Sequence, residues 1–156
     1  MRSILLIDHG SVKPEANHML ACVAGLLQHM VGDGVLVRYG HMELAEPSIA
    51  DGFAACVRDG ATDVVAFPYM LSPGKHSTRD IPRMVAEVAK DFPNVTYRVT
   101  EAFGVSAQLC EVIAQRAAVD IAHPATDADA CRCWDPAGRV GECGAACTGK
   151  VAESIA

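Results

Sequence analysis

Three histidines follow short apolar segments of this chain: His9, His41 and His76. Neutral imidazole is the commonest protein ligand for borderline divalent ions such as cobalt, nickel, iron and zinc. Its unperturbed pKa of about 6.5 also makes it a base at neutral pH. Two such rings with carboxylates nearby would form an open metal site that also accepts protons. For each histidine alone, a loop side chain that only hydrogen-bonds to the backbone is the alternative.

Acidic side chains follow the second of these apolar segments. Glu43 and Glu46 come shortly after His41, so their carboxylates could lie near the same site. The alternative is an ordinary solvated acid near the N-terminus of the next helix, where the helix dipole favours negative charge. The sequence leaves both interpretations of Glu43 open.

The stretch over residues 64–82, VVAFPYMLSPGKHSTRDIP, organises the predicted fold. Its apolar first half, followed by a Pro-Gly pair, is typical of a buried strand that enters a tight turn. Ser77 or Thr78 is predicted as the N-cap of the helix that follows. His76 is therefore expected in a strand-to-helix loop, at the carboxyl edge of a parallel sheet.

Apolar runs and helical periodicities alternate along the chain as far as residue 119. Four such strand-helix units predict an α/β fold, a four-stranded parallel sheet with helices on both faces. A flavodoxin-like order 2-1-3-4 would place the first and third strands side by side, with His9 facing His76 where such sheets bind ligands. Strands are predicted over residues 3–8, 35–39, from 64 and 95–100, with helices over 14–32, 47–60, from about 77 to 92 and 105–119.

The length and charge of the chain limit its organisation and its partners. At 156 residues it is expected to form one domain, residues 1–121, followed by a loosely structured Cys-rich extension, residues 122–156. The formal net charge of −6 and the pI near 5.4 argue against nucleic acid as a partner.

The apolar segments also bear on the compartment. The run before Asp8 is too short for a signal peptide, and no segment approaches the roughly 20 apolar residues of a membrane span. We therefore expect a cytoplasmic protein without membrane contact. In that compartment cysteines are expected as buried thiols or metal ligands rather than disulfides. Cys22, Cys56 and Cys110, scattered among apolar helix positions, are predicted to lie in the core.

Three sequence blocks stand out together. They are LIDHGS with PEAN (residues 6–11 and 14–17), ELAEPSI (residues 43–49), and LSPGKH with DIP (residues 71–76 and 80–82). They resemble the signature blocks of the small, single-domain sirohydrochlorin chelatases. These class II enzymes are lyases that insert cobalt, iron or nickel into a tetrapyrrole without ATP, in cobalamin or siroheme synthesis. The resemblance extends over residues 1–118.

The resemblance implies a set of site residues. His9 and His76 would be the metal ligands, and His9 would also accept a proton. Glu46 and the loop that ends at His76 would contact sirohydrochlorin. The implied contacts in that loop are Leu71, Ser72, Pro73, Gly74, Lys75 and His76.

Metal insertion also requires a grip on a flat substrate with many carboxylates at its rim. The candidate cations for those carboxylates are Lys13, Arg38, Lys75 and Arg79. Backbone N–H groups in the Pro-Gly-Lys turn and at the following helix N-terminus could bind a further carboxylate. Because the net charge is negative, attraction of this anionic substrate has to be local.

Two positions depart from the family pattern. Val12 stands where many relatives carry Arg, so Lys13 would have to meet a substrate carboxylate there. Residues 104–107 read Gly-Val-Ser-Ala where relatives often read Gly-x-His-Pro, which removes one further histidine from the edge. Neither change affects the implied ligands, but both leave the choice of metal and tetrapyrrole open.

The C-terminal extension carries a second group of potential ligands, with the spacing C-x-C-x₉-C-x₃-C. It lacks the paired C-x₂-C knuckles of a structural zinc site. Four thiolates could hold a [2Fe–2S] cluster, as the Cys-rich extensions of some family relatives do. Binding of another metal, or a disordered extension with reduced thiols, are the alternatives. The four residues are Cys131, Cys133, Cys143 and Cys147.

Two other functions compete with chelation. Histidine phosphatases and mutases also place His-Gly after a first strand, but they need Arg before that histidine to bind phosphate, and Asp8 would repel it. A metal carrier or sensor would use the histidines and thiols only to hold an ion. Such a protein needs no macrocycle site, so metallation of a free tetrapyrrole distinguishes it from a chelatase.

The resemblance also bears on assembly. Longer family relatives carry two such domains in one chain. A single-domain version is therefore expected to recreate that pairing as a homodimer, because twofold symmetry is the commonest closed arrangement.

Overall fold

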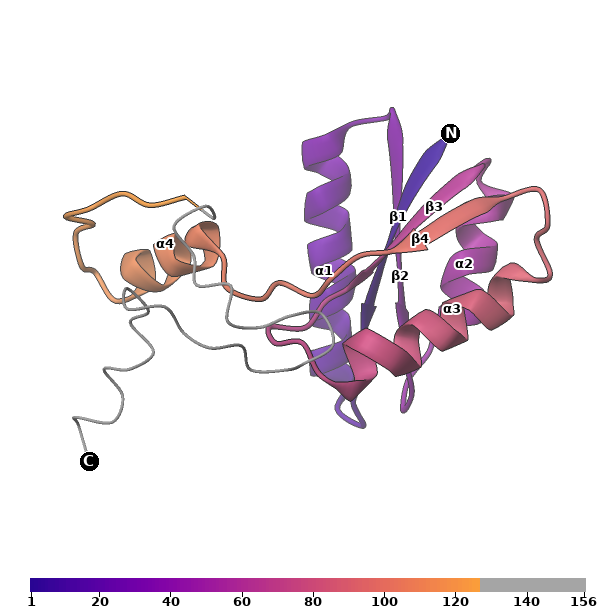
Figure 1. The fold of residues 1–156 in the computed structure, drawn as a ribbon, viewed down its shortest axis with the longest axis horizontal. Helices are drawn as coiled ribbons and strands as arrows, with labels where there is room; N and C mark the ends of the chain where they lie inside the picture. Colours follow the sequence, from indigo (N-terminus) through magenta and orange to yellow (C-terminus); the bar gives the residue numbers. More distant parts are fainter. Residues whose placement is uncertain (127–156) are drawn as a thin grey trace, which may run out of the picture.

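Four parallel strands form the centre of the computed structural model, which describes residues 1–126 (Figure 1). Helices connect successive strands, and one more helix follows the last strand. The strands are β1 (Arg2–Asp8), β2 (Val35–His41), β3 (Asp63–Pro68) and β4 (Thr96–Val99). The helices are α1 (Pro14–Val31), α2 (Ile49–Arg58), the π-helical turn η1 (His76–Asp80), α3 (Ile81–Ala89) and α4 (Ala107–Arg116).

The strand order in the sheet is β2-β1-β3-β4, and every neighbouring pair is parallel. This order confirms the predicted flavodoxin-like arrangement. Ile7 of β1 pairs with Gly40 of β2 on one side and with Pro68 of β3 on the other. Because these three strands end at the same level, the loops that carry the histidines leave the sheet at one edge.

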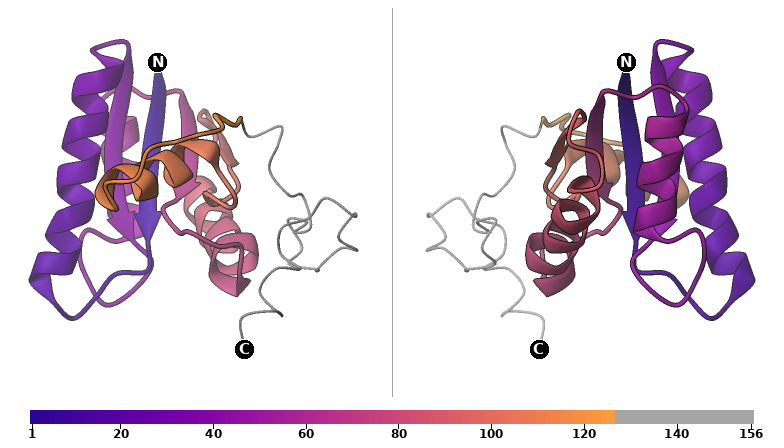
Figure 2. Two further views of the ribbon diagram at one scale, coloured as in Figure 1. Left: turned by 90° about the vertical axis from the view of Figure 1, so that its left-hand side faces the viewer. Right: turned by 90° about the vertical axis from the view of Figure 1, so that its right-hand side faces the viewer.

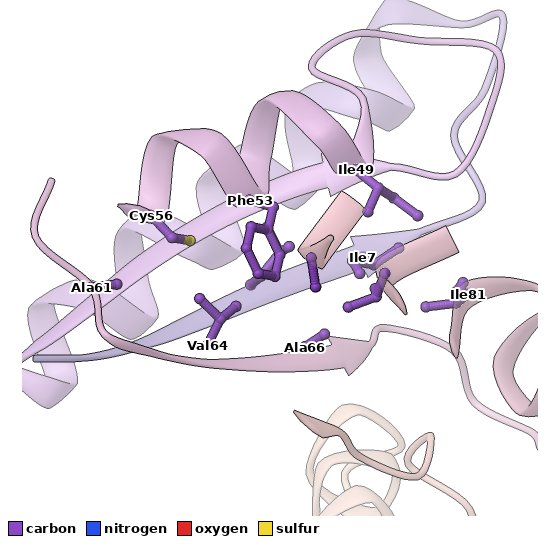
Figure 3. Close-up of a cluster of buried hydrophobic side chains, with 11 residues drawn as sticks. Ile7, Ile49, Phe53, Cys56, Ala61, Val64, Ala66 and Ile81 are labelled. Atoms are coloured by element: carbon purple, nitrogen blue, oxygen red, sulfur yellow. The ribbon is translucent and has the colours of Figure 1, made fainter. Parts of the chain in front are cut away.

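One face of the sheet is covered by α2 and α3, which enclose the larger core (Figure 3). Val64 and Ala66, alternate residues of β3, pack there with Phe53 of α2 and Ile81 of α3. All four are fully buried. Burial of a large apolar side chain stabilises a fold by about 1.5–3 kcal/mol. The packing of Ile81 therefore anchors α3, and the η1 turn that precedes it, to the sheet.

The opposite face is covered by α1, as Figure 2 shows. Leu20 and Ala24 of α1 are buried against Leu6 of β1 and Val37 of β2. Helices thus lie on both faces, which confirms the predicted fold class. Since α1 begins a few residues after β1 ends, this packing also fixes the loop that contains His9.

The last helix, α4, does not pack against the sheet as the other helices do. Helix α4 has no buried residue, and it stands away from the sheet in Figure 1. Val112 and Ile113 on α4 are exposed. On the α1 side of β3, the ring of Phe103 lies 5.1 Å from those of both Phe67 and Tyr69. The segment before α4, rather than α4 itself, therefore contacts that end of the sheet.

Of the three cysteines predicted to lie in the core, only one does so. Cys56 of α2 is fully buried, and burial raises the pKa of its thiol. Cys22 on α1 and Cys110 on α4 are exposed, so the prediction is wrong for both. The reason is that α1 buries only one side against the sheet and α4 buries none. A helical position next to apolar residues can therefore still face solvent.

The cysteines of the C-terminal extension, from Cys131 to Cys147, lie outside the described residues. The predictions made for them stay predictions. Within residues 1–126, no helix combines the length and the apolar character needed to cross a bilayer.

Candidate metal and substrate site

His9 and His76 lie side by side at the carboxyl edge of the sheet. Their ring centroids are 5.2 Å apart, and the ring planes are inclined by 72° in an edge-to-face contact. Both side chains are nearly half exposed, at 42% and 46%. The adjacency predicted from strand order is confirmed, because β1 and β3 are neighbours and each delivers one ring to the same edge.

The His9 ring is held from both of its nitrogens. Nδ1 lies 3.2 Å from the carbonyl oxygen of Gly10, and Nε2 lies 2.9 Å from Oε1 of Glu43. A carbonyl and a carboxylate are both acceptors, so the two hydrogen bonds form together only when both nitrogens carry protons. An ion that binds Nε2 therefore has to displace Glu43 from that nitrogen or share it.

Glu43 reaches His9 because the loops after β1 and β2 run against each other. The Glu43 N–H donates to the carbonyl of His9 at 3.1 Å, and the Met42 N–H donates to that of Asp8 at 2.9 Å. A Cβ atom at Gly10 would lie 1.9 Å from the Glu43 carbonyl oxygen, and the φ of Gly10 is +82°. Only glycine permits this approach. Of the two interpretations of Glu43, the structure supports the one at the site.

His41 does not join the exposed pair. Its side chain is 1% exposed, and Nδ1 lies 2.6 Å from Oδ1 of Asp8. The same oxygen of Asp8 accepts the N–H of Gly10 at 2.9 Å. His41 Nε2 is buried without a hydrogen-bond partner among the described residues. His41 therefore lies at the same edge of the sheet but is buried there, where it supports Asp8 and the loop of His9.

His76 has an aspartate as its partner. Nδ1 of His76 lies 3.0 Å from Oδ2 of Asp80, and Nε of Arg79 lies 3.1 Å from Oδ1 of the same carboxylate. Partial burial raises the pKa of Asp80, but the hydrogen bond and charge of Arg79 and the contact with His76 outweigh it and hold that pKa below its usual value. Asp80 is therefore ionised at neutral pH.

The loop before His76 is largely exposed, and Gly74 in it forms hydrogen bonds with residues of the following turn. The Gly74 N–H donates to Oγ of Ser77 at 3.0 Å, and the hydroxyls of Ser77 and Thr78 donate to the Gly74 carbonyl. Ser77 and Thr78 are therefore not N-caps as predicted, because the helical turn already begins at His76. The Gly74 N–H is also occupied, so it is not one of the free backbone donors expected for a substrate carboxylate. Leu71 of the same loop is 69% exposed.

Glu46 lies at the start of α2. Its Oε2 accepts the backbone N–H of Ser48 at 2.7 Å, one residue before the helix. The side chain is exposed at the same edge as the histidines. It makes no hydrogen bond to either ring within the described part of the chain.

The candidate cations separate into two groups. Arg38 points away from the site, because Nη2 lies 2.6 Å from Oδ2 of Asp59 at the far end of α2, so its role as a rim contact is wrong. Lys13 and Lys75 are exposed and form no ion pair with the described residues. They remain available for an anionic ligand.

Within residues 1–126, no group of three or more His, Cys, Asp or Glu side chains is arranged to hold a metal ion. The site is accordingly an open pair of histidines with one carboxylate against each ring, Glu43 at His9 and Asp80 at His76. Such a pair leaves coordination positions free, as transfer of an ion to another molecule requires.

Comparison with known proteins assigns this doubly covered parallel sheet to a protein family. The model of the CbiX family matches residues 3–119, and the chain belongs to this family. It is 40% identical over 128 residues to the chloroplastic sirohydrochlorin ferrochelatase of Arabidopsis thaliana. This alignment covers 82% of this chain and 56% of that protein.

Two further comparisons involve cobalt. The chain is 32% identical over 116 residues to a sirohydrochlorin cobaltochelatase of Priestia megaterium, covering 74% of this chain and 37% of that protein. The sirohydrochlorin chelatase SirB of Bacillus subtilis subspecies spizizenii, solved in complex with cobalt, superposes with a TM-score of 0.69 at 27% identity. That superposition covers 75% of this chain and 50% of SirB. The chain spans about half the length of these relatives.

Proposed function

We propose that this protein inserts a divalent metal ion, cobalt, iron or nickel, into sirohydrochlorin without ATP. The observation that carries the proposal is the exposed pair of imidazoles, His9 and His76, whose centroids are 5.2 Å apart at the ligand-binding edge of a CbiX fold. Relatives named as ferrochelatase and cobaltochelatase support the reaction class. The domain responsible is residues 1–121.

His9 and His76 hold the incoming ion in this proposal. Two imidazole ligands bind a borderline divalent ion while leaving positions open for the pyrrole nitrogens. Weak binding is required, since the ion has to leave the protein. An open pair meets this need better than a closed four-ligand cage.

His9 also accepts a proton released from the macrocycle. Insertion of M²⁺ replaces two pyrrole N–H protons, and both must leave the site. The Gly10 carbonyl and the Glu43 carboxylate are acceptors that can each receive a hydrogen bond from the ring once it carries the proton. When the ion leaves Nε2, that nitrogen is free to take a proton and return to Glu43.

The rim of sirohydrochlorin meets the loops on either side of the histidines. Glu46 and residues 71–76 contact the macrocycle, and Leu71 offers an exposed apolar surface to its flat face. Lys13 and Lys75 meet substrate carboxylates by charge-assisted hydrogen bonds. This arrangement supplies the local attraction that the net charge of −6 does not.

The choice of ion is set by ligand geometry and by metal availability more than by ligand type. Relatives of both kinds, iron and cobalt, match this chain. Cobalt or iron is therefore the proposed ion, with nickel as a further candidate.

Metallation of free sirohydrochlorin by the purified protein tests the proposal. The absorption spectrum of the tetrapyrrole should change with Co²⁺ or Fe²⁺ faster with protein than without it, and His9→Ala and His76→Ala should remove the difference. Ion binding without acceleration would instead identify a metal carrier or sensor and reject the chelatase.

The extension carries a second proposal, a [2Fe–2S] cluster held by four thiolates. Protein purified without oxygen should then be brown, with iron and acid-labile sulfide in equal amounts. Removal of the chain after Ala122 should abolish the colour and spare chelation, because both histidines precede the cut. The proposed ligands are Cys131, Cys133, Cys143 and Cys147.

Two further expectations concern assembly and compartment. A homodimer is proposed, because twofold symmetry is the commonest closed arrangement, and a monomeric mass at micromolar concentration would reject this. The proposed location is the cytoplasm. Recovery of the protein in an organelle fraction of its cell would reject that location, and the chloroplastic relative makes the measurement worthwhile.

A further inference from the structure

The two imidazoles of the site are tied at Nδ1 by groups of different charge. His9 Nδ1 meets the neutral carbonyl oxygen of Gly10 at 3.2 Å, whereas His76 Nδ1 meets the carboxylate of Asp80 at 3.0 Å. The Asp80 side chain is 15% exposed, while that of His76 is 46% exposed. The partner of His76 is therefore a largely sheltered anion beneath an exposed ring.

An ionised carboxylate can only accept hydrogen bonds. The 3.0 Å contact therefore requires the proton of neutral His76 to sit on Nδ1, which leaves the lone pair on Nε2. No hydrogen bond from the described residues reaches His76 Nε2. Free imidazole side chains in water carry their proton mainly on Nε2, so without Asp80 the Nε2 lone pair would mostly be lost.

We propose that Asp80 is a positioning residue that holds His76 in the Nδ1–H form and presents its Nε2 lone pair to the incoming metal ion. This inference rests on the proposed role of His76 as a metal ligand. A carboxylate behind a metal-binding imidazole also increases the basicity of the ring as a ligand, and loss of such a partner typically lowers metal affinity about 10–100-fold.

The local fold keeps Asp80 in place. Residues 76 and 80 face each other across the η1 turn, and Arg79 holds the second carboxylate oxygen at 3.1 Å. The buried Ile81 that follows anchors the turn to the core. Asp80 therefore keeps its orientation when the ion leaves, and His76 is ready for the next one.

The first experiment reads the position of the proton directly. Long-range ¹H–¹⁵N NMR of the ¹⁵N-labelled full chain, at a pH where histidines are neutral, distinguishes the two tautomers, and His76→Ala assigns the signal. The wild type should show His76 protonated on Nδ1. Asp80→Ala should shift it mainly to Nε2, and Asp80→Glu should restore part of the Nδ1 form.

The second experiment measures the steady-state KM for Co²⁺ in chelation. Asp80→Asn and Asp80→Ala should raise this KM about 10–100-fold while kcat changes much less, because saturating metal refills the weakened site. Glu87→Gln removes an exposed carboxylate of α3 whose ion pair among the described residues is with Lys90, so it serves as the matched control and should change neither the tautomer nor KM.

The outcomes separate this inference from the proposed function. Normal chelation by His76→Ala would reject His76 as a ligand, and the inference with it. If His76→Ala is inactive while Asp80→Ala keeps the wild-type tautomer and the wild-type KM, the chelatase proposal stands and the role of Asp80 is wrong. Asp80→Glu, which keeps the charge, excludes unfolding as the cause if it recovers both readouts.

Discussion

His41 and His76 each meet an aspartate through Nδ1, His41 at 2.6 Å from Asp8 and His76 at 3.0 Å from Asp80. The first ring is buried with Nε2 enclosed, whereas the second is nearly half exposed and its Nε2 receives no hydrogen bond from the described residues. In our proposal, the same kind of contact therefore stabilises the fold at His41 and prepares a metal ligand at His76. What differs is whether the second nitrogen can reach a ligand.

The first prediction removes the exposed rings. His9→Ala should lower kcat/KM for metal insertion by about 10²–10⁴-fold, because a base is lost as well as a ligand. His76→Ala should lower it by more than about 100-fold, because loss of a residue behind a ligand already costs about 10–100-fold and here the ligand itself is lost. Chelation assays give these values. The unfolding free energy should stay close to that of the wild type, since neither ring is buried, and chemical denaturation checks this.

The second prediction concerns the contact at Gly10 between the loop after β1 and the loop after β2. Gly10→Ala places a Cβ atom 1.9 Å from the Glu43 carbonyl oxygen at a φ of +82°. The backbone strain alone should cost about 1–3 kcal/mol, and the loop of Glu43 has to move away from His9. Denaturation midpoint and activity should therefore fall together. Gly34→Ala, where an added Cβ meets nothing within 4 Å, is the control.

The third prediction tests the buried ring itself. His41→Ala should lower the unfolding free energy by about 1–3 kcal/mol, because the partly buried carboxylate of Asp8 loses its imidazole partner and keeps only the N–H of Gly10. His18→Ala, on the exposed side of α1, should change stability little. An unchanged denaturation midpoint for His41→Ala would show that the Asp8–His41 pair does not stabilise the fold.

The smallest effect is expected at the opposite edge of the sheet. The hydrogen bond from Arg2 holds the pKa of Asp63 below its usual value. The folded state therefore binds protons less readily than the unfolded state, and the stabilisation is complete above the unfolded-state pKa of about 3.9. It is lost as pH falls through the lower folded-state pKa.

Asp63→Asn should therefore cost under about 1 kcal/mol at neutral pH, because the pair with Arg2 is near the surface. The difference in unfolding free energy from the wild type should shrink toward zero in acid. Denaturation curves at several pH values between neutrality and strong acid measure it. A difference that is constant over this range would reject the electrostatic origin.

The parallel sheet and the pairing of His9 with His76 could be predicted from the sequence. Apolar runs that alternate with helical periodicities predicted the four strands, and the rules of parallel sheets then predicted that β1 and β3 are neighbours. Because side chains after neighbouring parallel strands leave the sheet at one edge, His9 and His76 could be paired before the structure was known.

Other features depended on tertiary contacts between distant segments. The sequence did not distinguish the buried His41 from the exposed His76, since both follow an apolar strand. The Glu43–His9 contact requires two loops to approach at Gly10, and Arg38 turned out to pair with Asp59 at the far end of α2. The Asp80–His76 contact could have been suspected from the spacing of four residues.

The sequence by itself therefore determined which chemical groups reach the carboxyl edge, because strand and helix periods are local properties of the chain. Tertiary structure decided which of those groups meet solvent, which meet each other, and that Nε2 of His76 receives no hydrogen bond from the described residues. Burial and hydrogen-bond partners depend on segments tens of residues apart, such as Asp8 and His41, and no local pattern encodes them.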